Sequence, residues 1–273
     1  MAWICLKRPL FGPQQAHRPS SSINPHMMNT LTTTFVRRLR DRDESAWFEL
    51  WETFGPVLRA QLAKWGKGRI GVETVRDLTQ ETLAALSDSI DRYDPSRGAR
   101  FSTWLLSLAK HALGDEIDRR QALKRGAGKR PAELDERFMC QAATVEADEI
   151  YQQRVFCAKV YAAIRKAESE ADFMQFQVYR MRVFDGKPGK QVAESLGISE
   201  PTVSRHLQRV RDVLRKRLSE TVALYSFTAE ESSEAERAGL GTDDMMFDEA
   251  LCEIYHRQSR LILEDESAAS QRF

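Results

Sequence analysis

Apolar side chains recur at spacings of three and four residues from residue 35 to about residue 120, which is the period of one helix face. The pattern is interrupted where Asp94 is followed by Pro95 and Gly98, because these residues are disfavoured inside a helix. We therefore predict helices on both sides of a loop over residues 92–100. The apolar positions are Phe35, Leu39, Trp47, Leu50, Trp51, Phe54, Val57, Leu58, Leu62, Leu78, Leu83, Leu86 and Ile90 before the loop, and Phe101, Trp104, Leu105, Leu108, Ala112 and Ile117 after it.

The periodic pattern stops after this helix and begins again at Ile150. It continues with interruptions to about Leu224, and no run of alternating apolar and polar residues indicates a strand. We predict an all-α fold in which two small helical domains are joined by a flexible linker. The predicted divisions are a disordered lead-in (1–34), a first helical domain (35–125), the linker (126–149), a second helical domain (150–224) and a C-terminal extension (225–273).

The charge of the chain is distributed unevenly along its length. The 273 residues carry a formal net charge of only +1. Residues 180–217 contain ten Lys and Arg against four Asp and Glu, whereas residues 228–273 contain twelve acidic residues against four basic ones. The basic segment is typical of a surface that binds a polyanion such as DNA, and the acidic extension must serve another purpose.

Composition and spacing exclude several classes of protein. No segment approaches the roughly 20 consecutive apolar residues that span a bilayer. The cysteines Cys5, Cys140, Cys157 and Cys252 fit no metal or redox spacing, so we expect reduced thiols in a cytoplasmic protein. Paired carboxylates, a glycine-rich phosphate loop and a metal-ligand cluster are missing from the sequence. We therefore predict no enzyme activity, no cofactor, no metal and no small-molecule ligand.

The strongest local motif lies in the second domain and predicts a helix-turn-helix. Val192 and Ala193 face inward on a short helix, and the small Ala193 side chain allows a second helix to cross closely. Gly197 suits the left-handed conformation that ends a helix. Ser199 is placed to cap the next helix, whose first turn tolerates Pro201.

The second helix of this motif has an inward and an outward face. Val203 and Leu207 are spaced to face the core, while the outward residues can donate to phosphates and to base edges in a major groove. The alternative is a polar face that is merely solvated. We expect Arg205 to meet a base edge, and we expect phosphates to be bound by Arg209, Arg211 and Arg215. The predicted DNA-reading residues are Ser199, Thr202, Ser204, Arg205, Gln208, Arg209 and Arg211.

Three segments of the first domain resemble the sigma-70 superfamily of RNA polymerase sigma factors, specifically the small extracytoplasmic-function (ECF) type. Residues 77–83, 92–105 and 110–120 are similar to regions 2.2, 2.3 and 2.4 in their order and spacing, and the helix-turn-helix is similar to region 4.2. The resemblance implies a region 2 helical bundle followed by a region 4 domain. An extension like that over residues 225–273 is not part of the minimal family pattern.

The resemblance implies that the chain binds core RNA polymerase and directs transcription initiation at promoters. In the family, an edge of region 2.2 docks on the clamp of the largest polymerase subunit, and the flap of the second-largest subunit is a further contact. The matching residues here are Asp77, Leu78, Gln80 and Glu81, whose carboxylates and amide suit arginines on a partner. Asp77 and Glu81 could instead only stabilise the first turn of their helix.

The resemblance also implies that the first domain recognises and melts the −10 promoter element and that the helix-turn-helix binds the −35 element. Aromatic rings can stack on separated bases while cations hold the backbone. Tyr93, Phe101 and Trp104 could equally be core residues, and His111 stands where the family usually has asparagine, which leaves its base-reading role open. The residues implied at the −10 element are Tyr93, Arg97, Arg100, Phe101, Thr103, Trp104, Lys110, His111, Arg119 and Arg120.

A helix-turn-helix regulator that is not a sigma subunit is the alternative function. Such a protein would need a sensor in its first domain, and neither a receiver pattern nor a strand-lined pocket is visible. We expect a nucleoid-associated protein of the cytoplasm that has core polymerase and promoter DNA as partners. A separate regulator such as an anti-sigma factor stays open as a further partner.

The acidic extension allows three interpretations. It could regulate in cis by laying its negative charge across the basic helix-turn-helix face. Its apolar positions from Phe247 to Leu263 could form one amphipathic helix that docks on the chain itself or on another protein. It could also be a disordered tail that adds solubility.

Overall fold

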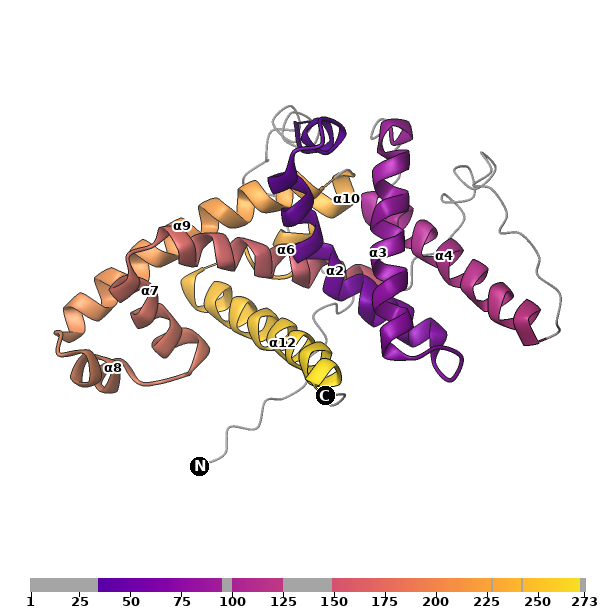
Figure 1. The fold of residues 1–273 in the computed structure, drawn as a ribbon. Coiled ribbons are helices and arrows are strands. Elements are labelled where there is room, and N and C mark those ends of the chain that lie inside the picture. The colour runs from indigo at the N-terminus through magenta and orange to yellow at the C-terminus, as the bar shows by residue number, and fades with distance from the viewer. Residues whose placement is uncertain (1–33, 95–99, 125–148, 227, 242, 271–273) are drawn as a thin grey trace.

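The computed structural model describes residues 34–94, 100–124, 149–226, 228–241 and 243–270. All regular elements in these ranges are helices, which confirms the predicted all-α class (Figure 1). Arg97, and the lead-in and linker apart from residues 34 and 149, lie outside the described residues. The elements are a helix over residues 34–40, α2 (Glu44–Gly66), α3 (Val72–Ser89), η1 (Ile90–Arg92), α4 (Phe101–Lys124), α6 (Glu149–Glu170), α7 (Phe173–Tyr179), η4 (Arg180–Phe184), α8 (Gly189–Leu196), α9 (Glu200–Tyr225), α10 (Ala229–Ser232), α11 (Glu234–Arg237) and α12 (Asp244–Ser270).

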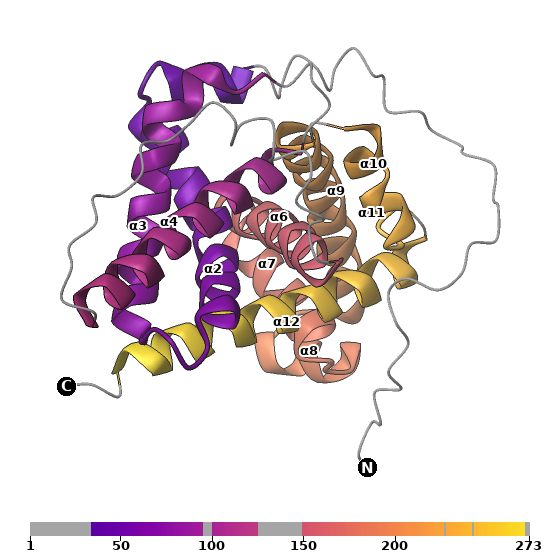
Figure 2. The same cartoon turned by 90° about the vertical axis from the view of Figure 1, so that its right-hand side faces the viewer.

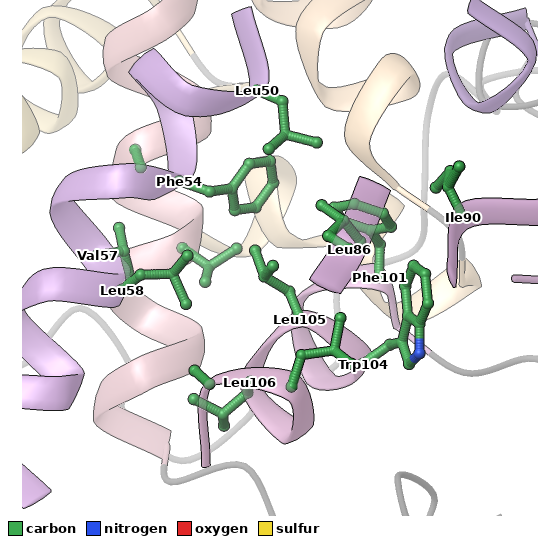
Figure 3. Close-up of a cluster of buried hydrophobic side chains, with 14 of the residues drawn as sticks. Leu50, Phe54, Val57, Leu58, Leu86, Ile90, Phe101, Trp104, Leu105 and Leu106 are labelled. Atoms are coloured by element: carbon green, nitrogen blue, oxygen red, sulfur yellow. The ribbon is translucent and has the colours of Figure 1, made fainter. Parts of the chain in front are cut away.

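The first bundle is formed by the helix over residues 34–40 together with α2, α3 and α4. Asp43 is the N-cap of α2, and its carboxylate accepts hydrogen bonds from the backbone N–H of Ser45 and Ala46 at 2.9 and 3.2 Å. This cap satisfies amide groups that have no partner inside the helix. Figure 3 shows the resulting core, in which side chains from all three long helices point toward one another, among them Leu50, Phe54, Leu58, Leu86, Phe101 and Leu105.

The second bundle is formed by α6, α7, η4, α8 and α9. α6 and α9 lie side by side over much of their length, and α7 and α8 pack against the N-terminal part of α9 (Figure 1). The predicted inward residues are where the spacing placed them, since Val192, Ala193, Val203 and Leu207 all lie in this core. The helix-turn-helix is therefore held by a continuous apolar core.

The acidic extension folds as part of the second bundle. α12 packs against α6 and η4 and crosses toward α2, so that one helix lies along both bundles (Figure 2). Phe247, Leu251 and Ile254 are fully buried in the same core as the helix-turn-helix. Burial of three large apolar side chains excludes a disordered tail for this part of the extension.

The two bundles are also joined directly. The first half of α6 contributes Tyr151 and Val155 to the first core. Tyr225, at the end of α9, packs edge-on against Phe35 and Phe54 with ring centroids 5.1 and 5.4 Å apart. Residues of the predicted second domain (150–224) and of the predicted extension (225–273) thus help to build the core of the first domain. The helical period located these segments but did not show which core they join.

Two ion pairs tie α6 to α2 near this junction. Arg165 pairs with Glu52, and Lys166 pairs with Glu49. Over the ranges that the structure describes, no helix has the length and apolarity to cross a membrane, and no cluster of three potential metal ligands forms.

Candidate nucleic-acid and polymerase interface

The helix-turn-helix is built from α8, a tight turn and the first half of α9. α8 ends at Gly197, which has φ of +65° and provides the left-handed conformation that β-carbon-bearing residues avoid. Ser199 then caps α9 by accepting a hydrogen bond from the backbone N–H of Thr202 at 3.4 Å. Pro201 lies in the first turn of α9, where its missing N–H removes no helical hydrogen bond.

The outward face of α9 is open to solvent over its first three turns. Ser199, Ser204, Gln208 and Arg209 are exposed, and Thr202 is partly exposed. Their own hydrogen bonds are local, such as that from the Gln208 amide to Asp212 at 3.2 Å. DNA can replace bonds of this kind without disturbing the core, so the predicted reading face is accessible.

Arg205 lies at the centre of this face. Its guanidinium donates to the Thr202 hydroxyl at 3.1 Å and to the Pro201 carbonyl at 3.4 Å, which folds the side chain back along the first turn of α9. Both of these acceptors are neutral groups at the surface. Arg205 is therefore free to exchange these partners for a base edge or a phosphate.

Arg211 belongs to the predicted DNA-reading set but faces α12 instead of solvent. It donates to Asp248 at 2.6 Å and to Asp244 at 3.2 Å. The hydrogen bond to Asp248 raises the pKa of the guanidinium above its ordinary value. Arg215, one turn further on, pairs with Asp244 at 2.8 Å and covers the Phe247 ring at 4.5 Å.

The predicted polymerase-docking edge lies on α3. Asp77, Gln80 and Glu81 are exposed and share one edge of the helix, whereas Leu78 is buried in the first core. Contact between Leu78 and a partner would require it to leave that core, because its side chain is buried. Partial burial, followed by the negative charges of Asp115 and Glu116 on α4, raises the pKa of Glu81.

The aromatic residues that could stack on bases form a cluster with one another. The rings of Tyr93 and Trp104 stack with centroids 4.8 Å apart, and Phe101 packs edge-on against both at 5.4 and 5.9 Å. All three are under 5% exposed. The core interpretation thus describes this conformation, and base stacking by these rings stays a prediction that requires the cluster to open. Burial, and then the negative charges of Glu231 and Asp94, raises the pKa of Tyr93.

The later residues of α4 that the resemblance implies at the −10 element lie in two pairs along that helix, Lys110 with His111 and Arg119 with Arg120. Lys110 is exposed, and His111 lies 3.6 Å from Asp115. Arg119 and Arg120 both bind the carboxylate of Glu116, at 2.6 and 2.5 Å. Burial of Glu116 opposes its ionisation, but the hydrogen bonds from Arg120 and Arg119 outweigh this and lower its pKa. Arg119 remains largely in solvent, whereas the terminal nitrogens of Arg120 also donate to the Thr74 hydroxyl at 2.6 Å and to the Arg69 carbonyl at 3.4 Å.

Arg100 and Thr103 lie at the start of α4, beside the extension. Arg100 donates to Glu234 at 2.9 Å, to Glu230 at 3.1 Å and to Gln152 at 3.2 Å. Thr103 is partly exposed and accepts from Gln152. The cation predicted for the −10 element is thus bound by carboxylates of α10 and α11 in this conformation.

The family models match both parts of this surface. The model described as Sigma-70 region 2 matches residues 50–123, and that described as Sigma-70, region 4 matches residues 175–214. The chain is a sigma-70 protein of the ECF type. No curated protein and no solved structure gave a significant match to it.

The matched ranges fit the elements of this sigma-70 protein closely. Region 2 runs from within α2 through α3 and α4, and region 4 runs from α7 to the middle of α9. α6 and the segment from α10 to α12 lie outside both matches. The family models therefore do not include α6, which connects the two regions, or α10 to α12, which pack against them.

Several residues of this sigma-70 protein were not singled out by sequence reasoning. The clearest is Lys159, whose ammonium lies 3.0 Å from Glu231 with both side chains under 3% exposed. A signal was available, because Lys159 stands in a run of apolar residues that face the core. The acidic partners Glu230, Glu234, Asp244 and Asp248 gave no such signal, since nothing in the local sequence distinguishes them from other carboxylates of the extension.

Proposed function

We propose that this protein binds core RNA polymerase and directs it to promoters, with region 2 recognising and melting the −10 element and region 4 binding the −35 element. The presence of both sigma-70 regions on one chain supports a sigma factor role. The observation that carries the finer proposal is the outward face of α9, which is exposed, basic and mounted on a well-formed helix-turn-helix. The protein would then act in the cytoplasm at the nucleoid.

The edge of α3 supports the polymerase contact. Asp77, Gln80 and Glu81 project from one side of a helix whose other side is buried, so their polar groups are accessible to a partner. Asp115 on α4 extends the negative charge of this edge, as its effect on Glu81 indicates. A partner surface rich in arginine, as expected for the clamp of the largest subunit, would complement it. The flap of the second-largest subunit would be the contact for region 4.

The decisive experiment combines the purified protein with core RNA polymerase that lacks any sigma subunit. Transcripts from a library of genomic fragments are then sequenced from their 5′ ends. A sigma factor yields initiation at a set of sites that share −10 and −35 sequences. A regulator that is not a sigma subunit yields no specific initiation until a sigma factor is added, and that result would overturn the proposal.

Two sets of variants assign the contacts. Asp77→Ala and Gln80→Ala should weaken binding to core polymerase and leave binding of the isolated protein to duplex DNA unchanged. Asp88→Ala is the matched control, because this exposed carboxylate lies on the same helix three turns away, roughly 16 Å along the axis. Equal losses for Asp77→Ala and Asp88→Ala would show that only overall charge matters.

For the −35 contact, Arg205→Ala should change the preferred sequence by about 1–3 kcal/mol at one base position, or about 5- to 150-fold in affinity. Arg209→Ala should weaken binding to all sequences alike, because a phosphate contact carries no base information. An unchanged preference in Arg205→Ala would show that another residue reads that position.

A further inference from the structure

The C-terminal extension contacts both DNA-binding regions through carboxylates. At region 4, Asp244 and Asp248 of α12 bind Arg211 and Arg215 of α9, with N–O distances from 2.6 to 3.2 Å. The hydrogen bond from Arg215 lowers the pKa of Asp244, so the acid is ionised at neutral pH. The guanidinium groups are therefore partnered by full negative charges.

At region 2, the short helices α10 and α11 present a second set of carboxylates. Glu230 and Glu234 lie 3.1 and 2.9 Å from the two terminal nitrogens of Arg100. Glu231, between them, is buried against Lys159 of α6, and its charge also affects Tyr93 in the aromatic cluster. The extension thus lies beside the part of region 2 that the family resemblance assigns to the −10 element.

The extension is held in this position by apolar packing. Phe247, Leu251 and Ile254 are in the second core, and the Tyr255 ring stacks on Phe184 with centroids 4.1 Å apart and planes at 2°. His256 forms a hydrogen bond with the Phe184 carbonyl at 2.8 Å. Because α12 continues toward α2, the same packing that fixes its acidic end on region 4 also crosses to region 2 (Figure 2).

Carboxylates and phosphates compete for the same arginine geometry. A guanidinium binds either anion through paired N–H donors, and an arginine that is already paired releases no counterion when DNA approaches. We infer that the extension is an intramolecular latch that competes with DNA for Arg100, Arg211 and Arg215. This inference rests on the proposed function, since it concerns the regulation of the same DNA-binding surfaces.

The latch weakens DNA binding without abolishing it. Arg205 and Arg209 remain exposed on the outward face of α9, so base reading at the −35 element is open in this conformation. The cations that the latch holds are Arg211 and Arg215, which follow the exposed residues along α9, and Arg100 at the start of α4. For these positions the resemblance and the chemistry suggest contacts with the DNA backbone. Its expected effect is therefore on affinity and salt dependence and not on sequence preference.

The test measures binding of the full-length protein to a fluorescent DNA duplex of mixed sequence at several salt concentrations. Asp244→Asn removes the charge that pairs with Arg215, whereas Asp248 continues to hold Arg211. One recovered phosphate contact steepens the slope of log K against log salt by about 0.9, which is about eightfold in affinity at 0.1 M salt. The double change Asp244→Asn with Asp248→Asn should approach about twice that slope change.

The matched control is Glu249→Gln, which removes one charge from an exposed position of the same helix. It should leave the slope unchanged, because it releases no arginine. If Asp244→Asn and Glu249→Gln have the same affinity and slope, the latch at region 4 is refuted. Asp244 is 44% exposed at its side chain and its ion pairs are with the two arginines, so its replacement keeps the core and stays informative if the double variant unfolds.

The region 2 end is tested in the same way with a single-stranded oligonucleotide. Glu230→Gln with Glu234→Gln should tighten binding by releasing Arg100, whereas Glu236→Gln, an exposed neighbour, should not. Equal binding in these variants would refute the latch at this end. Neither assay contains polymerase, so the latch and the proposed function fail separately. If the wild-type protein cannot direct initiation, the proposed function is refuted. If DNA binding is unchanged in the variants, the latch is refuted.

Discussion

We predict that the buried ion pair between Lys159 and Glu231 helps to hold the extension on α6. The two side chains are under 3% exposed and 3.0 Å apart. At an effective dielectric constant of about 20, two unit charges at this distance attract by about 5–6 kcal/mol. Lys159→Met removes the cation and leaves the buried Glu231 carboxylate without the Lys159 ammonium, which should cost about 3–5 kcal/mol of folding free energy.

The double variant distinguishes the ion pair from simple packing. Lys159→Met combined with Glu231→Gln removes the charge from both side chains, and the Gln oxygen can still accept a hydrogen bond from the Thr228 backbone N–H, as Glu231 does at 3.2 Å. The double variant should therefore be more stable than Lys159→Met alone, since two uncharged groups avoid the desolvation that one unpaired charge suffers.

Thermal unfolding followed by far-ultraviolet circular dichroism measures these effects. A loss of 3–5 kcal/mol should lower Tm by about 6–20 °C in a chain of this size. Lys166→Met is the control on the same helix. Its ion pair with Glu49 is between partly exposed side chains, so the loss should stay below about 1 kcal/mol. The reasoning is refuted if Lys159→Met lowers Tm no more than Lys166→Met does. It is also refuted if the stability that the double variant loses equals the sum of the losses in Lys159→Met and Glu231→Gln.

Two further predictions concern local chemistry and backbone conformation. Burial raises the pKa of the Cys157 thiol to about 11, so at pH 8 it should react with iodoacetamide about 100 times more slowly than an ordinary thiol, and peptide mapping by mass spectrometry measures this rate. Gly197→Ala should cost about 1–2 kcal/mol because φ is +65° there, whereas Gly114→Ala, in an exposed helix interior with no atom within 4 Å of the new carbon, should stabilise the protein by about 1 kcal/mol. Chemical denaturation checks the two signs, and equal effects would contradict the role of Gly197.

Local features of the helix-turn-helix were predictable because each depends on a few neighbouring residues. The left-handed turn at Gly197, the cap at Ser199 and the burial of Val203 follow from backbone geometry and helical period, and the structure contains all three. The exposed positions of Arg205 and Arg209 follow from the same period. Local sequence carries this information because a helix face is defined within two or three turns.

The role of the aromatic residues was not predictable in the same way. Tyr93, Phe101 and Trp104 have the chemistry of a base-stacking surface and of a core, and spacing alone does not separate the two. The structure separates them because Phe54 of α2 completes the cluster from 47 positions earlier in the chain than Phe101, with ring centroids 5.8 Å apart. Such a contact depends on how helices pack, which the period of one helix does not encode.

The same limit applies to the extension. The amphipathic pattern from Phe247 onward was visible, and so was the opposite charge of the two C-terminal segments. The pairing of Arg211 with Asp244 and Asp248, however, connects positions 33 and 37 residues apart on separate helices. Charge composition indicated that a contact was possible, but only the packing of α12 on α6 determines which acid meets which arginine.

The packing of α12 also determines how the extension should be studied. Deleting residues 226–273 would remove Phe247, Leu251 and Ile254 from the second core. Burial of each such side chain contributes about 1.5–3 kcal/mol, so their loss removes about 5–9 kcal/mol. This is comparable to the total stability of a typical domain, about 5–15 kcal/mol.

We therefore expect the shortened protein to lose cooperative unfolding and to bind the hydrophobic dye ANS. The deletion would also leave Lys159 buried without Glu231, which adds to the loss. A control that ends at Leu263 keeps the described side chains of α12 and should unfold like the full chain. A deletion of residues 226–273 that melts at the wild-type temperature would contradict a structural role for the extension. If the deletion variant instead melts at a lower temperature, altered transcription by that variant reports unfolding of region 4. In that case only the charge substitutions at Asp244 and Asp248 measure release of the latch.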